Sequence, residues 1–483
     1  MLEARKISFS YNGTTLVLDS LDCHVKCGEI VLLTGSTGSG KSTLAKCLSG
    51  FIPKSIRGEF SGSVIIDNSD ISDLEIAELS RQVALVQQDP ESQICTLQVS
   101  DEVAFGPENH GNEVEEISMV VNSSLKSIDA AHLYERATFE LSGGEKQRLI
   151  IAAMIACRPR YLILDEPSSS LDPRGIIQLR QILKELKSQD IGIMVIEHNL
   201  MNIQPIADRV LLLSDGKILP LDRPDYKEPI ASRPRPTNAA SSPLLTTKNL
   251  EFSYGNRKVI ENVTLSVHEG EMVGLMGNNG SGKTTLLGLL GGLLVPDNGT
   301  IYFGESSLGN MNTREIAHHI VTVFQNPNHQ IFEKTVWKEQ ILTLNALDLI
   351  TNDTLQQCEG LLEKAGIGDL KDRNPFSLSH GQKRRLNVSS TITHKPEVLL
   401  LDEPFIGQDV EGRDFIRENV FETTKTGGAA IIVTHDPSFV LHHCDRAIFM
   451  ENGSILLDGS PSSVLERLES IGYKEFADLG VHP

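Results

Sequence analysis

The sequence predicts an α/β protein whose β-sheet is mostly parallel, and it predicts that this fold occurs twice in the chain. The first observation behind this prediction is that short apolar runs alternate with helical stretches. In the first half the apolar runs are residues 30–33, 64–66, 161–164, 193–196 and 209–213. Short, fully apolar runs separated by helices are typical of parallel strands that are buried on both faces.

The second observation is an internal repeat. GSTGSGKST at residues 35–43 recurs as GNNGSGKTT at 277–285, which is 242 residues later, and LILDEP at 162–167 recurs as LLLDEP at 399–404, 237 residues later. Gln88 and Gln325, like His198 and His435, are also 237 residues apart. A chain of 483 residues is therefore predicted to hold one domain of about 240 residues twice, rather than three unrelated domains.

The predicted first domain covers residues 1–219, a connector covers 220–245, and the second domain covers 246–483. The connector contains six of the chain's 21 prolines, so we expect it to be extended and semi-rigid. Its expected role is to keep the two similar domains at a high effective concentration, so that they pair within one chain.

Composition excludes several classes of protein. Lys and Arg number 44 against 64 Asp and Glu, and the resulting net charge of −20 argues against a protein that holds nucleic acid by a basic surface. No stretch approaches the roughly 18–20 apolar residues of a membrane span, and the N-terminus has no apolar region typical of a secretory signal. The seven cysteines are scattered, which favours free thiols in a reducing compartment over a metal site. We expect a soluble, intracellular chain.

Each half contains a GxxxxGK[ST] motif directly after an apolar run, which is the context of a phosphate-binding loop. Glycines let successive backbone N–H groups point at one phosphate, the following helix contributes its positive end, and the lysine adds a charge. Two copies in register make a chance match untenable. The predicted nucleotide-binding residues are Gly35, Ser36, Thr37, Gly38, Ser39, Gly40, Lys41, Ser42 and Thr43 in the first half, and Gly277, Asn278, Asn279, Gly280, Ser281, Gly282, Lys283, Thr284 and Thr285 in the second.

An Asp-Glu pair ends a later apolar run in each half. Asp165 and Asp402 are predicted to hold Mg²⁺ together with the hydroxyls of Ser42 and Thr284, since oxygen ligands suit this ion. The next residues, Glu166 and Glu403, are placed to polarise an attacking water. His198 and His435 end the following apolar run and are predicted to contact the γ-phosphate. These four residues are the predicted catalytic groups.

LSGGEKQR at residues 141–148 resembles the signature motif of ATP-binding cassette (ABC) ATPases. The resemblance covers nearly the whole chain outside the connector, and it implies a P-loop NTPase fold. Each domain would then have a RecA-like sheet core, a small antiparallel β part and a helical subdomain. In this family two domains form a head-to-tail sandwich, with each ATP between the P-loop of one and the signature of the other. The resemblance assigns Tyr11 and Tyr254 to adenine stacking, and it assigns Gln88 and Gln325 to Q-loops that sense the metal. The signature residues are Ser142, Gly143, Gly144 and Glu145 in the first half and Ser379, His380, Gly381 and Gln382 in the second.

Two departures from the family pattern both lie in the second half. His380 replaces a signature glycine, and Gln408 stands where the first half has Leu171. By the sandwich arrangement, the second signature would complete the site built on Lys41. The hypothesis is therefore two unequal ATP sites, with the Lys283 site, completed by Ser142 and its neighbours, the stronger hydrolase. The alternative is neutral sequence drift.

The segment QQDPESQICTLQVSDEVAFGPEN at residues 87–109 resembles the corresponding part of energy-coupling-factor (ECF) transporter ATPases. In that family this surface receives a membrane scaffold. The second half begins similarly, with QNPNHQIFEKTV at 325–336, but it lacks the AFGP element, so we expect unequal contacts with the scaffold. The alternative for Phe105, Gly106 and Pro107 is an ordinary turn.

The predicted function is the motor subunit of an ECF-type importer at the cytoplasmic face of the cell membrane. The resemblance implies separate transmembrane scaffold (T-type) and substrate-binding (S-type) subunits. The fused arrangement looks like the ATPases of thiamine or hydroxymethylpyrimidine import, although related ATPases serve other vitamins, cobalt or nickel. The alternative is a tandem ABC ATPase acting on ribosomes. DNA-repair ATPases are disfavoured because the segment between each Q-loop and signature is too short for a long coiled coil.

Overall fold

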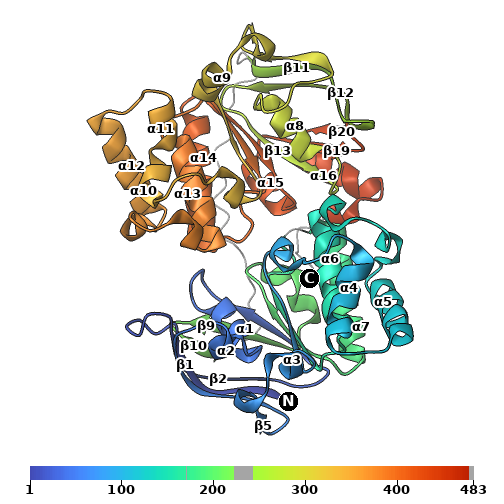
Figure 1. Ribbon diagram of the computed structural model, residues 1–483. Helices are drawn as coiled ribbons and strands as arrows, with labels where there is room; N and C mark the ends of the chain where they lie inside the picture. Colours follow the sequence, from blue (N-terminus) through green and yellow to red (C-terminus); the bar gives the residue numbers. More distant parts are fainter. Residues whose placement is uncertain (170, 222–242, 478–483) are drawn as a thin grey trace. The chain divides into compact units, whose positions relative to one another are not determined.

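The computed structural model describes residues 1–169, 171–221 and 243–477, and the chain divides into two units, Met1–Tyr226 and Lys227–Pro483 (Figure 1). Each unit is described separately below. None of the helices in the described ranges is both long enough and apolar enough to cross a membrane.

The core of the first unit is a six-stranded sheet in the order β10-β9-β3-β8-β7-β6. Its strands are β3 (Ile30–Thr34), β6 (Val83–Val86), β7 (Tyr161–Asp165), β8 (Gly192–Ile196), β9 (Arg209–Ser214) and β10 (Lys217–Pro220). All neighbours pair in parallel except β10, which is antiparallel to β9 at the edge. The predicted α/β class and mostly parallel sheet are confirmed.

The central strands are apolar throughout because both faces of the sheet are covered. Along β7, Leu162 and Leu164 belong to one core cluster, while Tyr161 and Ile163 belong to another on the opposite face. Successive side chains of a strand point to opposite faces, so a strand buried on both sides has no polar positions. Residues from helices α4 (Val99–Asn109), α5 (Val114–Ser127), α6 (Gly143–Ala156) and α7 (Pro173–Ser188) complete the first cluster. Residues from α1 (Lys41–Leu48) and an antiparallel sheet complete the second.

The antiparallel sheet of the first unit has the order β2-β1-β4-β5. Its strands are β1 (Leu2–Ser10), β2 (Leu18–Val25), β4 (Glu59–Ile66) and β5 (Ser69–Asp70). The helices are α1 (Lys41–Leu48), α2 (Phe51–Lys54), α3 (Ile76–Leu79), α4 (Val99–Asn109), α5 (Val114–Ser127), α6 (Gly143–Ala156) and α7 (Pro173–Ser188). Helices α4, α5 and α6 pack on one another and form the predicted helical subdomain (Figure 1).

The second unit repeats both sheets, in the orders β12-β11-β14-β15 and β16-β17-β18-β13-β19-β20. Its strands are β11 (Pro243–Tyr254), β12 (Arg257–His268), β13 (Met272–Gly277), β14 (Asn298–Phe303), β15 (Ser306–Ser307), β16 (Ile320–Val323), β17 (Val398–Asp402), β18 (Ala429–Val433), β19 (Arg446–Glu451) and β20 (Ser454–Gly459). Its helices are α8 (Lys283–Leu290), α9 (Thr313–His319), α10 (Val336–Gln340), α11 (Leu342–Ala346), α12 (Asn352–Lys364), α13 (His380–Ile392), α14 (Val410–Lys425), α15 (Pro437–His443) and α16 (Pro461–Ser470). The repeat in the sequence is thus a repeat of the fold.

The bounds of the connector differ from the prediction, and one alternative reading is excluded. The predicted connector, 220–245, overlaps secondary structure at both ends, because Pro220 ends β10 and β11 begins at Pro243; residues 222–242 lie outside the described part of the chain. The ordinary turn, which was the alternative for Phe105, Gly106 and Pro107, is not found, since these residues lie inside α4. A proline near the C-terminal end of an eleven-residue helix is compatible with this, since the turns before it keep their hydrogen bonds.

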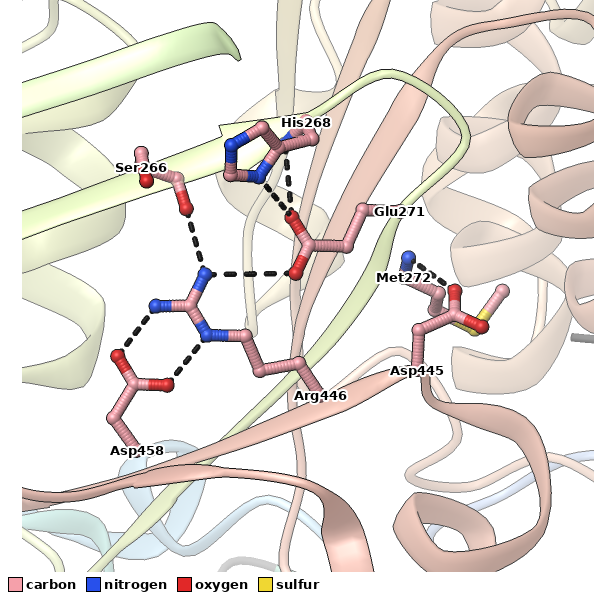
Figure 2. Close-up of polar contacts among 7 residues, drawn as sticks. All are labelled: Ser266, His268, Glu271, Met272, Asp445, Arg446 and Asp458. Atoms are coloured by element: carbon pink, nitrogen blue, oxygen red, sulfur yellow. Dashed lines mark hydrogen bonds and ion pairs between the residues drawn. The ribbon is translucent and has the colours of Figure 1, made fainter. Parts of the chain in front are cut away.

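In the second unit an arginine joins the two sheets to each other (Figure 2). Arg446, at the start of β19, donates to the carbonyl oxygen of Ser266 in the antiparallel sheet at 2.8 Å and pairs with Asp458 of β20. Glu271, just before β13, lies 3.5 Å from the same guanidinium, and its other oxygen accepts from the backbone N–H of His268 at 2.8 Å. Because these contacts bracket the start of β13, they orient the strand that leads into the second P-loop.

Candidate functional site

Each predicted phosphate loop connects a buried strand to a buried helix. Gly35 follows β3 and has a φ of 155°, and a Cβ at this position would lie 2.3 Å from the carbonyl oxygen of Leu213. The second loop repeats this geometry, since Gly277 has a φ of 147° and a Cβ there would lie 2.3 Å from the carbonyl oxygen of Met450. Only glycine fits at either position. Helices α1 and α8 then begin at the lysines of the motif.

The two lysines are buried and point back into their own loops. Lys41 Nζ donates to the carbonyl oxygens of Gly35 and Ser36, both at 2.8 Å. Lys283 donates to the two equivalent carbonyls of the second loop, also at 2.8 Å. A buried ammonium group needs such partners to offset its lost hydration. The contacts therefore hold a positive charge at the start of each helix, where the backbone N–H groups already favour an anion.

The aspartates of the Asp-Glu pairs end strands β7 and β17 beside the hydroxyls of the P-loops. Thr284 Oγ1 donates to Asp402 Oδ2 at 2.6 Å, and the Ser42 hydroxyl bonds to Asp165. Burial, together with the nearby Glu166 carboxylate, raises the pKa of Asp165 to about 6, and burial also raises the pKa of Asp402. Asp165 Oδ1 is buried and has no hydrogen-bond partner among the described residues.

These oxygens fit a divalent cation. A carboxylate whose buried oxygen lacks a donor is costly unless a proton or a cation compensates it. In each unit a hydroxyl oxygen lies next to a carboxylate oxygen, and Mg²⁺ takes such oxygen ligands together with waters and phosphate oxygens. Asp165 with Ser42, and Asp402 with Thr284, are therefore the residues that can hold Mg²⁺.

The predicted catalytic glutamates are buried and each contacts the predicted histidine of its own unit. His198 Nε2 lies 3.1 Å from Glu166 Oε1, and His435 Nε2 lies 3.2 Å from Glu403 Oε1. Both glutamates have left-handed backbone conformations, with φ values of 51° and 47°, which residues other than glycine rarely adopt. Burial and the adjacent Asp402 raise the pKa of Glu403 to about 8. A carboxylate that favours a proton in this way is suited to accept one from water.

The two Q-loop glutamines, predicted to have equivalent roles, differ between the units. Gln88 Nε2 donates to Glu166 Oε2 at 2.7 Å, so the side chain lies on the glutamate of its own site. Gln325 is exposed, and within the described ranges its side chain makes no hydrogen bond to Glu403 or to any other residue. The structure thus assembles Gln88 with the rest of its site and leaves Gln325 outside.

The two tyrosines assigned to adenine lie half-exposed at the ends of β1 and β11. Each ring packs edge-on against a phenylalanine two residues earlier, with centroids 4.7 Å apart for Phe9 and Tyr11 and 4.9 Å apart for Phe252 and Tyr254. The Tyr11 hydroxyl also lies 3.1 Å from Thr43 Oγ1 of the P-loop motif. An exposed ring held beside a phosphate loop can stack on a base.

The signature motifs form the N-terminal ends of α6 and α13. Ser142 caps α6 in a capping box with Glu145, and Ser379 caps α13 in a capping box with Gln382. The first turn of each helix contains the residues that follow the serine. These are Gly143 and Gly144 in the first unit, and His380 and Gly381 in the second. In the described part of the chain, neither serine makes a hydrogen bond to the P-loop of its own unit.

Gln408, one of the two departures noted in the second half, contacts the signature of its own unit. It is buried, and its Nε2 donates to the carbonyl oxygen of Gly381 at 3.1 Å. Its counterpart Leu171 instead joins the apolar core. The loop after the Asp-Glu pair is thereby tied to the signature helix by a polar contact in the second unit.

A buried glutamate of the first unit was missed in the sequence. Glu197, next to His198, accepts from the backbone N–H of Ser168 at 2.9 Å, and Asn202 Nδ2 donates to Ser168 Oγ at 2.8 Å. Burial raises the pKa of Glu197 to about 8. This network connects the strand end that carries the histidine to the loop after the Asp-Glu pair.

In the second unit, two of the three positions in this network are apolar. Thr434, Phe405 and Phe439 occupy the equivalent positions, and the two phenylalanine rings are 4.6 Å apart. The constant offset of 237 residues identifies all three equivalent positions. A comparison of the two halves at that offset is the signal that could have found the network.

The Glu197→Gln variant should be more thermostable than the native chain at alkaline pH. The raised pKa means that folding favours the protonated acid, so the native free energy of unfolding falls as pH rises from the ordinary value of 4.5 to about 8. Glutamine keeps the acceptor oxygen for Ser168 but cannot ionise. Calorimetry should show a gain of about 2–8 °C at pH 8.5 that disappears below pH 5. The exposed Glu135→Gln is the control, and a gain that does not depend on pH would contradict the assignment.

Comparison with known proteins matches this geometry to a family model described as ABC transporter, over residues 18–169 and 260–406. A Bacillus subtilis protein named "Putative HMP/thiamine import ATP-binding protein YkoD" is 32% identical, covering 97% of this chain and 93% of that protein. A Methanosarcina mazei protein named "Putative ABC transporter ATP-binding protein" is 34% identical, covering 95% of each chain.

Among solved structures, one similar chain comes from a complex of an archaeal ribosomal stalk protein with an archaeal ribosome recycling factor. Its TM-score is 0.63 at 23% identity, covering 94% of this chain and 90% of that one. At this level of identity the likeness shows a shared two-cassette fold and nothing about partners.

Proposed function

The chain belongs to the ABC transporter family of ATPases, and from this premise we propose that it is the ATP-hydrolysing motor subunit of an ECF-type importer. The chain carries two copies of the ATPase domain. Transport would require separate membrane subunits, of the T-type scaffold and the S-type substrate-binding kinds, at the cytoplasmic face of the membrane. The cargo would be a vitamin or a transition-metal ion. The name of the Bacillus subtilis relative favours a thiamine precursor among these.

In the proposed mechanism the P-loop lysines and backbone N–H groups bind the β- and γ-phosphates, and Tyr11 or Tyr254 stacks on the base. Mg²⁺, when bound, neutralises phosphate charge and helps to orient the γ-phosphate. Glu166 or Glu403 orients a water for in-line attack and takes its proton. The histidine paired with each glutamate contacts both that glutamate and the γ-phosphate, and so keeps them aligned. Catalysis then consists mainly of positioning and electrostatic stabilisation.

Each signature motif would serve the nucleotide bound by the other cassette, as the family resemblance implies. Ser142–Glu145 would complete the Lys283 site, and Ser379–Gln382 would complete the Lys41 site. A serine-capped helix start, with its free N–H groups, suits a γ-phosphate.

The observation that carries the transport proposal is an exposed apolar surface connected to a catalytic glutamate. This coupling surface consists of Leu97, Phe105 and Phe139, which are 74%, 48% and 71% exposed. It begins at Leu97, nine residues after Gln88, whose side chain bonds to Glu166. Leu97 and Phe139 lie on segments joined by a backbone hydrogen bond, and Phe105 lies on the helix that begins two residues after Leu97. Large exposed apolar side chains of this kind indicate a protein-binding site.

The backbone beneath the coupling surface is held in place. The Glu102 carboxylate of α4 accepts from the N–H groups of Cys95 and Thr96, at 2.9 and 2.8 Å, and so fixes the loop that follows the Q-loop. Thr138 N donates to the carbonyl oxygen of Leu97 at 3.0 Å, which holds the segment carrying Phe139 alongside. A partner that presses on this surface would thus act on the Q-loop.

The second unit has a reduced version of this surface. Phe332 and Phe376 are exposed, but Lys334 replaces Leu97, and α10 is only five residues long. We therefore propose that the first cassette makes the larger contact with the membrane scaffold.

Affinity purification of the tagged chain from its native membranes tests the function. Co-purification of two hydrophobic polypeptides is the expected result, and the double variant Leu97→Asp/Phe105→Asp should release at least about 90% of them by placing charge in an apolar contact. Ile177→Asp, which removes an exposed apolar side chain on α7, should release none. Recovery of ribosomes in place of membrane polypeptides would support the translation-related alternative.

A further inference from the structure

Arg384, on the signature helix α13 of the second unit, has the largest of the fully buried side chains in the described residues. Its Nη1 donates to the carbonyl oxygen of Phe324, and its Nη2 donates to that of Gln325, both in the Q-loop. Nη1 also lies 3.4 Å from the carbonyl oxygen of Asp402, at the end of β17. One guanidinium therefore connects the signature helix, the Q-loop and the strand that carries the metal-binding aspartate.

Two neighbouring side chains of the same helix extend this connection along the Q-loop. Asn387 Nδ2 donates to the carbonyl oxygen of Pro327 at 2.9 Å, and Lys383 Nζ donates to Asn328 Oδ1 at 3.0 Å. Residues 324–328 are thus bonded to α13 by three polar side chains. Hydrogen bonds from charged donors are about twice as strong as neutral ones, and Arg384 donates two of them to the Q-loop where Lys383 donates one, so Arg384 is the main contributor.

The first unit lacks two of these three contacts. Gln147 occupies the position of Arg384, and its buried Nε2 has no hydrogen-bond partner among the described residues. Ile150 replaces Asn387 and belongs to the apolar core. The remaining contact is an ion pair between Lys146 and Glu91.

The two signature helices differ at this position, and the two Q-loop glutamines differ in where their side chains lie. Where the helix carries Gln147, the Q-loop glutamine lies on the catalytic glutamate, with Gln88 Nε2 at 2.7 Å from Glu166 Oε2. Where the helix carries Arg384, the backbone carbonyls of the Q-loop are occupied and the side chain of Gln325 is exposed.

We propose that Arg384 is a positioning residue that locks the Q-loop of the second cassette to its signature helix and to the end of β17, so that Gln325 is held away from Glu403. In the first cassette only the ion pair between Lys146 and Glu91 joins the Q-loop to the helix at these three positions. The two cassettes therefore differ in how their Q-loops are held as well as in their signature residues. The inference depends on the ATPase activity alone, and the choice between transport and ribosome action does not affect it.

Hydrogen–deuterium exchange of the full chain without nucleotide tests the lock. In the Arg384→Gln variant, which introduces the residue of the first cassette, amides of residues 324–330 should exchange about tenfold faster or more. The equivalent residues 87–93 should change by less than about twofold and serve as an internal reference. Arg385→Gln removes the adjacent buried arginine, which makes no hydrogen bond to the Q-loop, and should leave residues 324–330 unchanged.

ATP turnover provides a second readout that a loss of stability alone would not produce. Arg384→Gln should alter kcat several-fold while KM for ATP stays within about twofold, since the residue contacts no P-loop atom. Arg384→Lys keeps the charge without the forked geometry, and its exchange should be intermediate. If Arg384→Gln does not fold, faster exchange confined to residues 324–330 in Arg384→Lys supports the lock. Unchanged exchange of residues 324–330, or equally faster exchange across the whole second cassette, overturns the proposal.

Discussion

Replacing both Glu166 and Glu403 by glutamine lowers steady-state ATP turnover by about a hundred- to ten-thousand-fold, while the chain still binds ATP. Glutamine has nearly the same shape as glutamate but cannot accept a proton from water. Both carboxylates are buried and lie within 3.2 Å of a histidine nitrogen, in a geometry that glutamine can keep. Phosphate release measures the turnover, and equilibrium titration with labelled ATP measures binding. Retention of more than about a tenth of the native rate would remove both residues from the catalytic role.

The two single variants separate the sites. Glu403→Gln should lose more turnover than Glu166→Gln, because Glu403 belongs to the Lys283 site, which the intact signature Ser142–Glu145 would complete. The Lys41 site would depend on the signature that contains His380. Glu135→Gln, at an exposed position, controls for the loss of one charge. Equal losses in the two single variants would contradict functional asymmetry and favour neutral drift.

Local motifs in the sequence predicted the parts of the site that depend on local chain geometry. A glycine-rich loop between an apolar strand and a helix has few possible conformations, so Lys41 and Lys283 lie where the motif places them. The same is true of Asp165, which follows four apolar residues and therefore ends a buried strand. Strands buried on both faces were also predictable, because their lack of polar residues follows directly from that burial.

Contacts between distant segments could not be predicted from such motifs. Arg384 belongs to a recognisable signature, but nothing in eight consecutive residues indicates that its guanidinium bonds to a loop about sixty residues earlier. Glu197 likewise looks like an ordinary polar residue beside His198, and only its burial explains its raised pKa, which the hydrogen bonds to Ser168 partly offset. Both differ from their counterparts in the other half. In a duplicated chain, the positions where the halves disagree are thus the ones where tertiary contacts have diverged.

The second large effect concerns the P-loop lysines. Lys41→Ala or Lys283→Ala should weaken ATP binding about ten- to a hundredfold at the altered site and leave the other site unchanged. Each lysine brings a buried charge to the start of a helix whose backbone N–H groups can bind the same phosphates. A calorimetric titration should therefore resolve one native and one weakened site, with Lys46→Ala, in the last turn of α1, as the control.

The other cassette makes this experiment decisive. Each lysine donates to two carbonyl oxygens of its own loop, so alanine could disturb the loop as well as remove the charge. The two loops belong to units with separate hydrophobic cores, so the core around the unaltered loop keeps its native composition. A loss at one site with native affinity at the other therefore reports the lysine's own role. Unchanged affinity at both sites in both variants would show that these loops do not bind the phosphates.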